Sequence, residues 1–95
     1  MQKKINSYVG YAIKSRNVLY GVANITGRQK PYVVLYDAKL SESSKSKLLY
    51  YTEKNGIEAF CADVESLYPG KNCFAMGITE KNLASAIIKV IKESE

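Results

Sequence analysis

The chain has 95 residues, 46% of them hydrophobic and 24% charged, with a net charge of +5, which is typical of one soluble globular domain. No apolar run approaches the roughly 20 residues of a membrane span, and polar residues follow the basic start at once, so we expect a cytoplasmic protein without a signal peptide. Histidine is absent and the two cysteines are not closely spaced, which excludes histidine-activated nucleophiles and an intrachain zinc finger, so we expect no enzyme, metal or cofactor.

Helical and strand-like patterns alternate along the chain. Apolar residues at helical spacing predict the helices, and continuous β-branched or aromatic runs predict the strands. In chain order we expect a helix over 3–16, a strand over 18–20, a strand over 32–36, a helix over 42–54, a strand over 57–62, one helical turn over 64–67, a strand over 73–78 and a last helix after Thr79. This order predicts an α/β fold, a three-layer α/β/α sandwich on a four-stranded mixed sheet, as one domain over 1–95.

Short polar residues and glycines predict where these elements begin and end. Ser41 is expected to cap the helix over 42–54, and Gly56 to close it in a left-handed conformation. Thr79 is expected to cap the last helix, and Asn17 to end the first. Between the first two strands, the sequence fits either a helical turn closed by Gly27 or a loop, and this alternative stays open.

Aromatic and thiol side chains are expected to be partly or fully buried. Tyrosines in such a small domain typically have half-buried rings and hydrated hydroxyls. This expectation covers Tyr8, Tyr11, Tyr32, Tyr36, Tyr50 and Tyr51. Cys61 and Cys73 are expected to be buried, reduced thiols next to strands.

Positive charge is concentrated in the first part of the chain. Residues 1–36 include six basic and no acidic side chains, whereas residues 37–95 include eight basic and nine acidic ones. The first part therefore carries a charge of +6 and the remainder −1. Such asymmetry indicates a polyanionic partner, although a solvated basic face without a partner produces the same pattern.

Three stretches of sequence, taken in order, resemble one protein family. They read NVLYG over 17–21, YVVLYDA over 32–38 followed by SSKSKL over 43–48, and FAMGITEKNLA over 74–84. Together they resemble the kink-turn-binding ribosomal protein superfamily, named after ribosomal protein L-seven-Ae, and especially its small bacterial members of the YlxQ type. The resemblance spans nearly the whole chain, and it implies binding of RNA at sharply bent, internally looped helices.

The family reads RNA with the start of its second helix. The motif there is Gly, any residue, Asn or Glu, Glu, any two residues and Lys. In this sequence Gly21 matches the motif, while Ala23 stands at the amide or acid position. Asn24 stands at the Glu position and Gly27 at the Lys position, with Arg28 one residue beyond. The resemblance therefore carries over Gly21 and, in part, Asn24.

Two segments on the RNA-binding side of the family are shorter in this chain. One lies between Gly21 and Tyr32, and the other between Leu67 and Cys73, where the family has an apolar loop that contacts flipped-out bases. Loops tolerate such deletions without loss of the fold. The sequence therefore predicts a degenerate kink-turn reader.

Basic and aromatic residues near these segments complete the expected RNA surface. Arginine and lysine hold phosphates, and tyrosine rings stack on unpaired bases. The candidates are Arg16, Arg28, Lys30 and Lys71 for phosphates, Tyr20 and Tyr68 for stacking, and Gly21 and Asn24 from the motif. For the two tyrosines, a half-buried structural position fits equally well.

We expect from these observations an RNA-binding accessory protein that associates with the ribosome or with structured RNA. The alternative is a protein-interaction module on the same scaffold that has lost the RNA reader. Neither interpretation involves a membrane or a catalytic residue.

Overall fold

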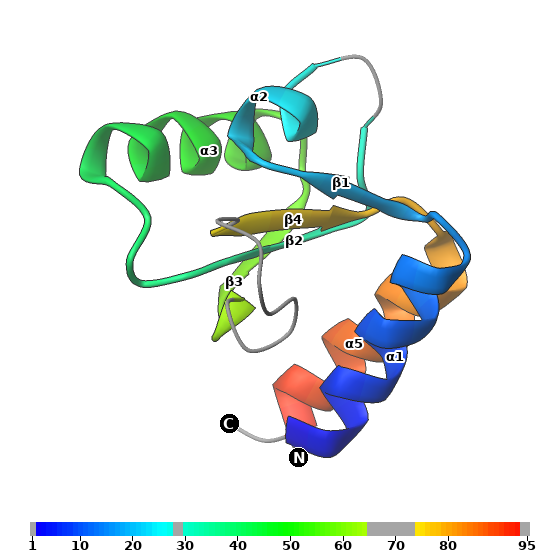
Figure 1. Cartoon of the computed structure of the whole chain (residues 1–95). Helices are drawn as coiled ribbons and strands as arrows, with labels where there is room; N and C mark the ends of the chain where they lie inside the picture. Colours follow the sequence, from blue (N-terminus) through cyan, green and yellow to red (C-terminus); the bar gives the residue numbers. More distant parts are fainter. Residues whose placement is uncertain (1, 28–29, 65–73, 94–95) are drawn as a thin grey trace.

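The computed structural model describes residues 2–27, 30–64 and 74–93 (Figure 1). Its elements are α1 (Gln2–Lys14), β1 (Val18–Tyr20), α2 (Val22–Ile25), β2 (Val33–Tyr36), α3 (Glu42–Lys54), β3 (Glu58–Cys61), β4 (Ala75–Ile78) and α5 (Lys81–Glu93). The predicted strands and long helices are all present close to their expected bounds. The predicted turn over 64–67 and the start of the predicted strand over 73–78 extend into residues outside the described ranges.

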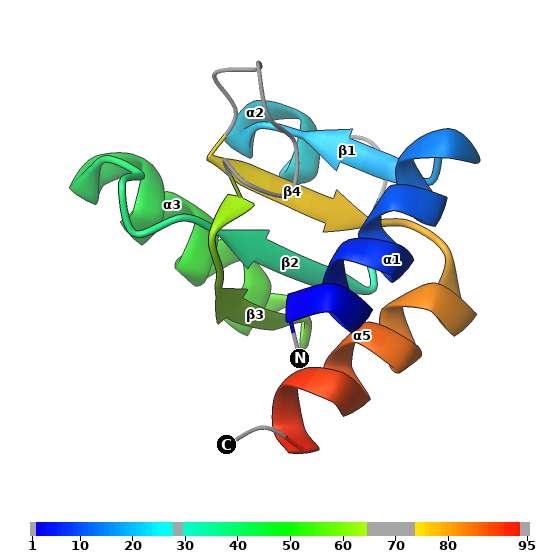
Figure 2. The ribbon, with the colours of Figure 1, turned by 60° about the horizontal axis from the view of Figure 1, so that its bottom comes forward.

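The four strands form one mixed sheet in the order β1-β4-β2-β3. β4 runs antiparallel to both of its neighbours, so that Ile78 pairs with Val18 on one side and with Val33 on the other. β3 runs parallel to β2, with Glu58 opposite Val33. β1, β2 and β3 therefore run in one direction (Figure 2). We call the end where these three strands begin the amino end of the sheet, and the end where they finish the carboxyl end.

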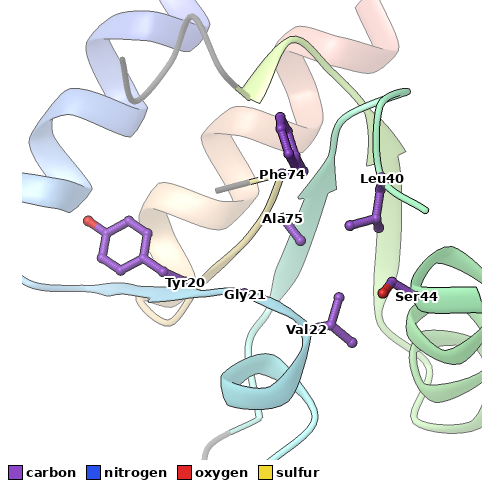
Figure 3. Close-up of a pocket in the computed structure, with 7 residues that line it drawn as sticks. All are labelled: Tyr20, Gly21, Val22, Leu40, Ser44, Phe74 and Ala75. Atoms are coloured by element: carbon purple, nitrogen blue, oxygen red, sulfur yellow. The ribbon is translucent and has the colours of Figure 1, made fainter. Parts of the chain in front are cut away.

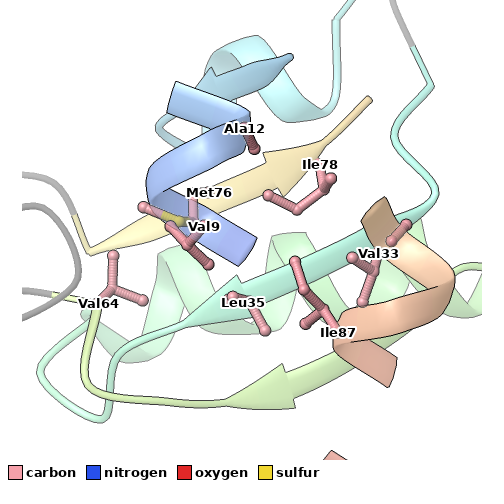
Figure 4. Close-up of a cluster of buried hydrophobic side chains, with 9 residues drawn as sticks. Val9, Ala12, Val33, Leu35, Val64, Met76, Ile78 and Ile87 are labelled. Atoms are coloured by element: carbon pink, nitrogen blue, oxygen red, sulfur yellow. The ribbon is translucent and has the colours of Figure 1, made fainter. Parts of the chain in front are cut away.

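Helices cover both faces of the sheet, which confirms the predicted α/β/α arrangement. α1 and α5 pack side by side on one face, and α2 and α3 cover the other (Figures 1 and 2). Because side chains alternate along a strand, Val33 and Leu35 point to the first face and Val34 to the second. The core beneath α1 and α5, shown in Figure 4, consists of Val9, Ala12, Val33, Leu35, Val64, Met76, Ile78, Ala84 and Ile87.

The helix boundaries agree with the sequence at α3 and need a correction at α5. Ser41 caps α3 with its side chain, and Gly56 closes that helix with φ +66°. At α5 the capping residue is Glu80, whose Oε2 accepts a hydrogen bond of 2.6 Å from the N–H of Leu83. Thr79 is not the cap because it lies two residues before Lys81, the first residue of α5, and its N–H donates to the carbonyl of Asn17 at 2.9 Å, next to β1; the helix therefore starts one residue later than predicted.

The open alternative between the first two strands is settled as a helical turn. α2 spans four residues, of which Ile25 is fully buried. Thr26 is its C-cap residue, and Gly27 does not close it in a left-handed conformation, because its φ is not positive. The turn begins earlier than the sequence indicated because the chain leaves β1 directly into the helix.

Cys61 is exposed and free, contrary to the expectation of a buried thiol. It is the last residue of β3, which is an edge strand whose first and last side chains are both exposed. Cys73 lies outside the described residues. None of the helices within the described ranges has the length and apolarity that a membrane crossing requires.

Candidate nucleic-acid interface

A pocket of about 320 Å³ opens at the carboxyl end of the sheet, between the first residues of α2 and α3 (Figure 3). The residues that line it are Tyr20, Gly21, Val22, Leu40, Ser44, Phe74 and Ala75. Figure 3 shows Leu40 and Ser44 on the α3 side of the opening, with the ring of Tyr20 on the side away from them. Ligand pockets typically measure roughly 300–1,000 Å³, so this one has room for a single base or one amino-acid side chain.

Gly21 shapes the rim of the pocket because it ends β1 and begins α2. Its N–H donates to the carbonyl of Ala75 at 2.9 Å, which extends the pairing of β1 with β4 by one residue. Its backbone then turns at φ +85° and ψ 152°, a conformation that is essentially restricted to glycine. Apart from its two chain neighbours, no described residue has an atom within 4 Å of a Cβ built there, so the requirement for glycine comes from the backbone and not from crowding.

Tyr20 and Asn24, both predicted RNA contacts, meet at the same rim. Nδ2 of Asn24 donates to the backbone carbonyl of Tyr20 at 2.7 Å, so the amide group is engaged within the protein. The Tyr20 side chain is half-buried and packs against the core beneath α1 and α5. Its backbone, more than its ring, therefore forms the pocket (Figure 3).

Arg16 and Lys30 lie at the amino end of the sheet, away from the pocket. Arg16 shortly precedes β1 and Lys30 shortly precedes β2, and both side chains are exposed. Lys30 contributes to a second pocket of about 290 Å³, which also includes Tyr32 and Gly56. The described candidates therefore form two groups at opposite ends of the sheet. The remaining candidates, Arg28, Tyr68 and Lys71, lie outside the described residues.

Arg16 closes α1 in a left-handed conformation with φ +61°, which residues other than glycine seldom adopt. Its N–H donates to the carbonyl of Ile13 at 3.1 Å, and the N–H of Asn17 donates to that of Ala12 at 2.8 Å. These two bonds form a Schellman motif, so Arg16 and not Asn17 is the residue that ends the helix. The arginine side chain is thus presented to solvent at a position where glycine would cost less free energy.

Three of the tyrosines that were expected to be half-buried are exposed. They are Tyr11, Tyr32 and Tyr50, with exposed fractions of 63%, 51% and 68%. The expectation fails because only one face of α1 and of α3 packs against the sheet, and Tyr11 and Tyr50 lie on the opposite faces. Tyr32 stands just before β2, where the chain enters the sheet.

Leu40, Ser44 and Phe74 also line the pocket, although none of them was a predicted site residue. Leu40 follows β2, Ser44 belongs to the first turn of α3, and Phe74 precedes β4. They meet because β4 lies between β1 and β2, and this strand order is not encoded in hydrophobic periodicity. Ser44 and Phe74 nevertheless belong to the second and third stretches of the family resemblance, just as Gly21 belongs to the first.

Comparisons with known proteins establish the fold and nothing further. No family model matches the chain, and no curated protein matches it. Among solved structures, the chain is similar to a protein of unknown function from Bacillus halodurans, with a TM-score of 0.81 and 17% sequence identity. The match covers 94% of this chain and 97% of that one.

Proposed function

We propose that this chain is a cytoplasmic RNA-binding accessory protein, associated with the ribosome or with structured RNA, and that the pocket at the carboxyl end of the sheet receives one unpaired base. The observation that supports this most is the position of the pocket. It opens at Gly21, the residue that matches the start of the RNA-reading motif, and Phe74 from the third matched stretch lines it. All three stretches of the resemblance, distant in sequence, thus contribute to one concave surface, the second of them through Ser44.

The chemistry of the lining fits a base better than a phosphate. Val22 and Leu40 supply apolar walls, the ring of Phe74 supplies an aromatic surface, and the Ser44 hydroxyl supplies a polar group that both donates and accepts. Unpaired bases in RNA loops are typically held by stacking and by a few hydrogen bonds to their edges. The basic residues of the first part of the chain would then attract the phosphates at longer range.

A protein-interaction module is the second candidate, and one observation favours it. Among the residues that the structure describes, no lysine or arginine lines the pocket. An apolar side chain of a protein partner would fit such a lining, and it would need no nearby cation. The two candidates differ in their salt dependence, because phosphate binding weakens steeply with salt and apolar burial does not.

Ser44 allows a test that leaves the fold intact. It occupies the third position of α3, after the capping residue Ser41, where Glu or Gln completes a capping box and supports the helix. Ser44→Glu adds a negative charge to the pocket, and Ser44→Gln adds the same bulk without charge.

We expect Ser44→Glu to bind a fluorescein-labelled RNA hairpin with an internal loop about tenfold more weakly than Ser44→Gln. The carboxylate would lose water beside the neutral base and would repel the phosphates that flank it. Fluorescence anisotropy at fixed salt measures the difference. Equal affinities of the two variants would show that RNA does not enter this pocket.

A further inference from the structure

The outward face of α3 presents an aromatic ring between two lysines. Lys47, Tyr50 and Lys54 follow one another at spacings of three and four residues, which places them along one side of a helix. All three are exposed, and Tyr50 exposes 68% of its surface, more than Tyr11 or Tyr32 does. Leu48 and Thr52 are buried on the opposite side of the same helix. The three outward residues therefore contribute little to the core, and we call them the α3 stripe.

The lysines of the stripe differ from three other lysines on the helices, although Lys14 and Lys81 also have no described carboxylate within 4.0 Å. Within the described residues, Lys45, Lys89 and Lys92 each lie within 4.0 Å of a carboxylate, at 3.6 Å, 4.0 Å and 2.8 Å. Neither lysine of the stripe has a described carboxylate within that distance. The nearest acidic residue in sequence, Glu53, is turned by about 100° around the helix from its neighbour Lys54. The stripe thus keeps its positive charge available for an external anion.

Tyr50 and Lys54 are already in contact with each other. Nζ of Lys54 lies 5.9 Å from the centre of the Tyr50 ring, within the range of a cation–π interaction, about 6 Å. This contact holds a cation beside an aromatic surface that remains mostly in solvent. A lysine in the last turn is favoured by the helix dipole, but the dipole explains neither the exposed ring nor Lys47.

We propose that the α3 stripe is a second RNA-contacting surface, which grips single-stranded or looped RNA by stacking a base on Tyr50 and neutralising phosphates with Lys47 and Lys54. Proteins that bind single strands combine these two elements, cations along the backbone and an aromatic ring for a base. The two lysines are about 10 Å apart along the helix axis, so their flexible side chains span more than one phosphate. The proposal shares its partner, RNA, with the proposed function but does not depend on the pocket.

The stripe begins about one helical turn beyond the pocket, on the same helix. The first turn of α3 lines the pocket through Ser44, and the stripe runs from the second turn to the last turn of the same helix. An RNA strand with one base in the pocket has the stripe as its nearest basic and aromatic surface along α3.

The test uses the intact chain and a fluorescein-labelled oligouridylate of twelve nucleotides, which has no internal loop. Tyr50→Ala should weaken binding by about 5- to 150-fold, the range that stacking one base on an aromatic ring spans, and Tyr50→Phe should restore it. The double variant Lys47→Gln and Lys54→Gln should reduce the slope of log affinity against log salt by about 1.4, or 0.7 for each single-strand phosphate contact. Its matched control, Lys89→Gln with Lys92→Gln, removes the same charge from α5 and should leave both affinity and slope unchanged.

Several outcomes would contradict the proposal that the α3 stripe contacts RNA. Tyr50→Ala binding as the parent does would exclude stacking, and equal losses in the two double-lysine variants would show attraction by net charge alone. Tight binding of polyglutamate that is insensitive to Tyr50→Ala would identify an acidic protein segment as the occupant. If the stripe variants bind RNA with the parent's affinity while Ser44→Glu binds more weakly than Ser44→Gln, the proposal for the stripe is rejected and the proposal for the pocket is supported. The reverse pattern supports the stripe and rejects the pocket.

Discussion

The side-chain amide of Asn24 donates a hydrogen bond of 2.7 Å to the backbone carbonyl of Tyr20. This bond joins α2 to the end of β1 and so fixes one rim of the pocket. In the family pattern this position holds a Glu, which can only accept hydrogen bonds when ionised. Asn24 is therefore a donor where the motif has an acceptor. Its amide nitrogen is already engaged in a hydrogen bond within the protein.

Asn24→Asp should destabilise the chain more than Asn24→Ala does. The alanine variant loses one hydrogen bond, worth about 0.5–1.5 kcal/mol. The aspartate variant loses the same bond and also places a carboxylate against the Tyr20 carbonyl oxygen, which adds repulsion. Urea unfolding, followed by circular dichroism, gives both free energies of unfolding. An aspartate variant as stable as the parent would show that the bond does not hold the rim.

Substitution of Arg16, which has a left-handed backbone, should change stability and RNA binding in opposite directions. Arg16→Gly should raise the free energy of unfolding by about 1 kcal/mol, because glycine adopts φ +61° without a steric penalty. Gly56→Ala, at the equivalent position of α3, should lower it by a similar amount. If Arg16 contacts RNA, the more stable glycine variant will bind RNA less well. Thermal unfolding and an RNA titration on the same samples measure the two effects, and a glycine variant less stable than the parent contradicts the assignment.

Gly77 is required by its neighbour Pro31. A Cβ added at Gly77 would lie 2.9 Å from Cβ and 3.1 Å from Cγ of the buried, rigid proline ring. Gly77→Ala should therefore cost about 1–3 kcal/mol of stability through overpacking. Gly10→Ala is the matched control: outside its chain neighbours and the backbone of its own helix, no described atom lies within 4 Å of its added Cβ, and alanine in α1 should stabilise by up to about 1 kcal/mol. Equal effects of the two substitutions in urea unfolding would contradict this packing.

Standard kink-turn RNA should bind this chain clearly more weakly than it binds a kink-turn-binding protein with the complete motif. Ala23 and Gly27 replace two motif side chains, and each directed contact is worth about 1–3 kcal/mol by analogy with groove recognition. A loss of two such contacts corresponds to a factor of roughly 30 to 25,000 in affinity. A gel-shift titration of both proteins at one salt concentration decides the point, and equal affinity would contradict it.

The sequence allowed the elements of the fold to be predicted but not the way they meet. Periodicity placed α3 and α5, and the glycine at position 56 marked the end of α3 with the expected left-handed backbone. Periodicity could not predict the order of the strands, because β4 lies between β1 and β2 through pairing of residues that are distant in sequence. For that reason Gly21 was predicted at the site, whereas Leu40 and Ser44 were not.

The tyrosine expectation fails for a reason that the sequence itself contains. Tyr50 and Tyr51 are adjacent in one helix and so point about 100° apart. When Tyr51 packs with Leu48 on the inner face, Tyr50 must face solvent, as it does with 68% exposure. A helical wheel with Leu48 on the inner face would have predicted that Tyr51 is partly buried and Tyr50 is exposed.

The measurement that tests the RNA-binding account most directly is a salt-dependent titration of a labelled RNA hairpin with an internal loop. It compares the parent chain with two variants that each lose two positive charges. Arg16→Gln with Lys30→Gln removes exposed charges from the acid-free first part of the chain, and Lys89→Gln with Lys92→Gln removes charges that lie within 4.0 Å of carboxylates.

We expect the parent to bind, the first variant to bind more weakly with a slope against log salt that is smaller by about 1.4, and the second variant to match the parent. Equal weakening of both variants would mean that binding follows net charge without a defined surface. A parent chain that does not bind the RNA at low salt would contradict the account and leave the protein-interaction module in its place.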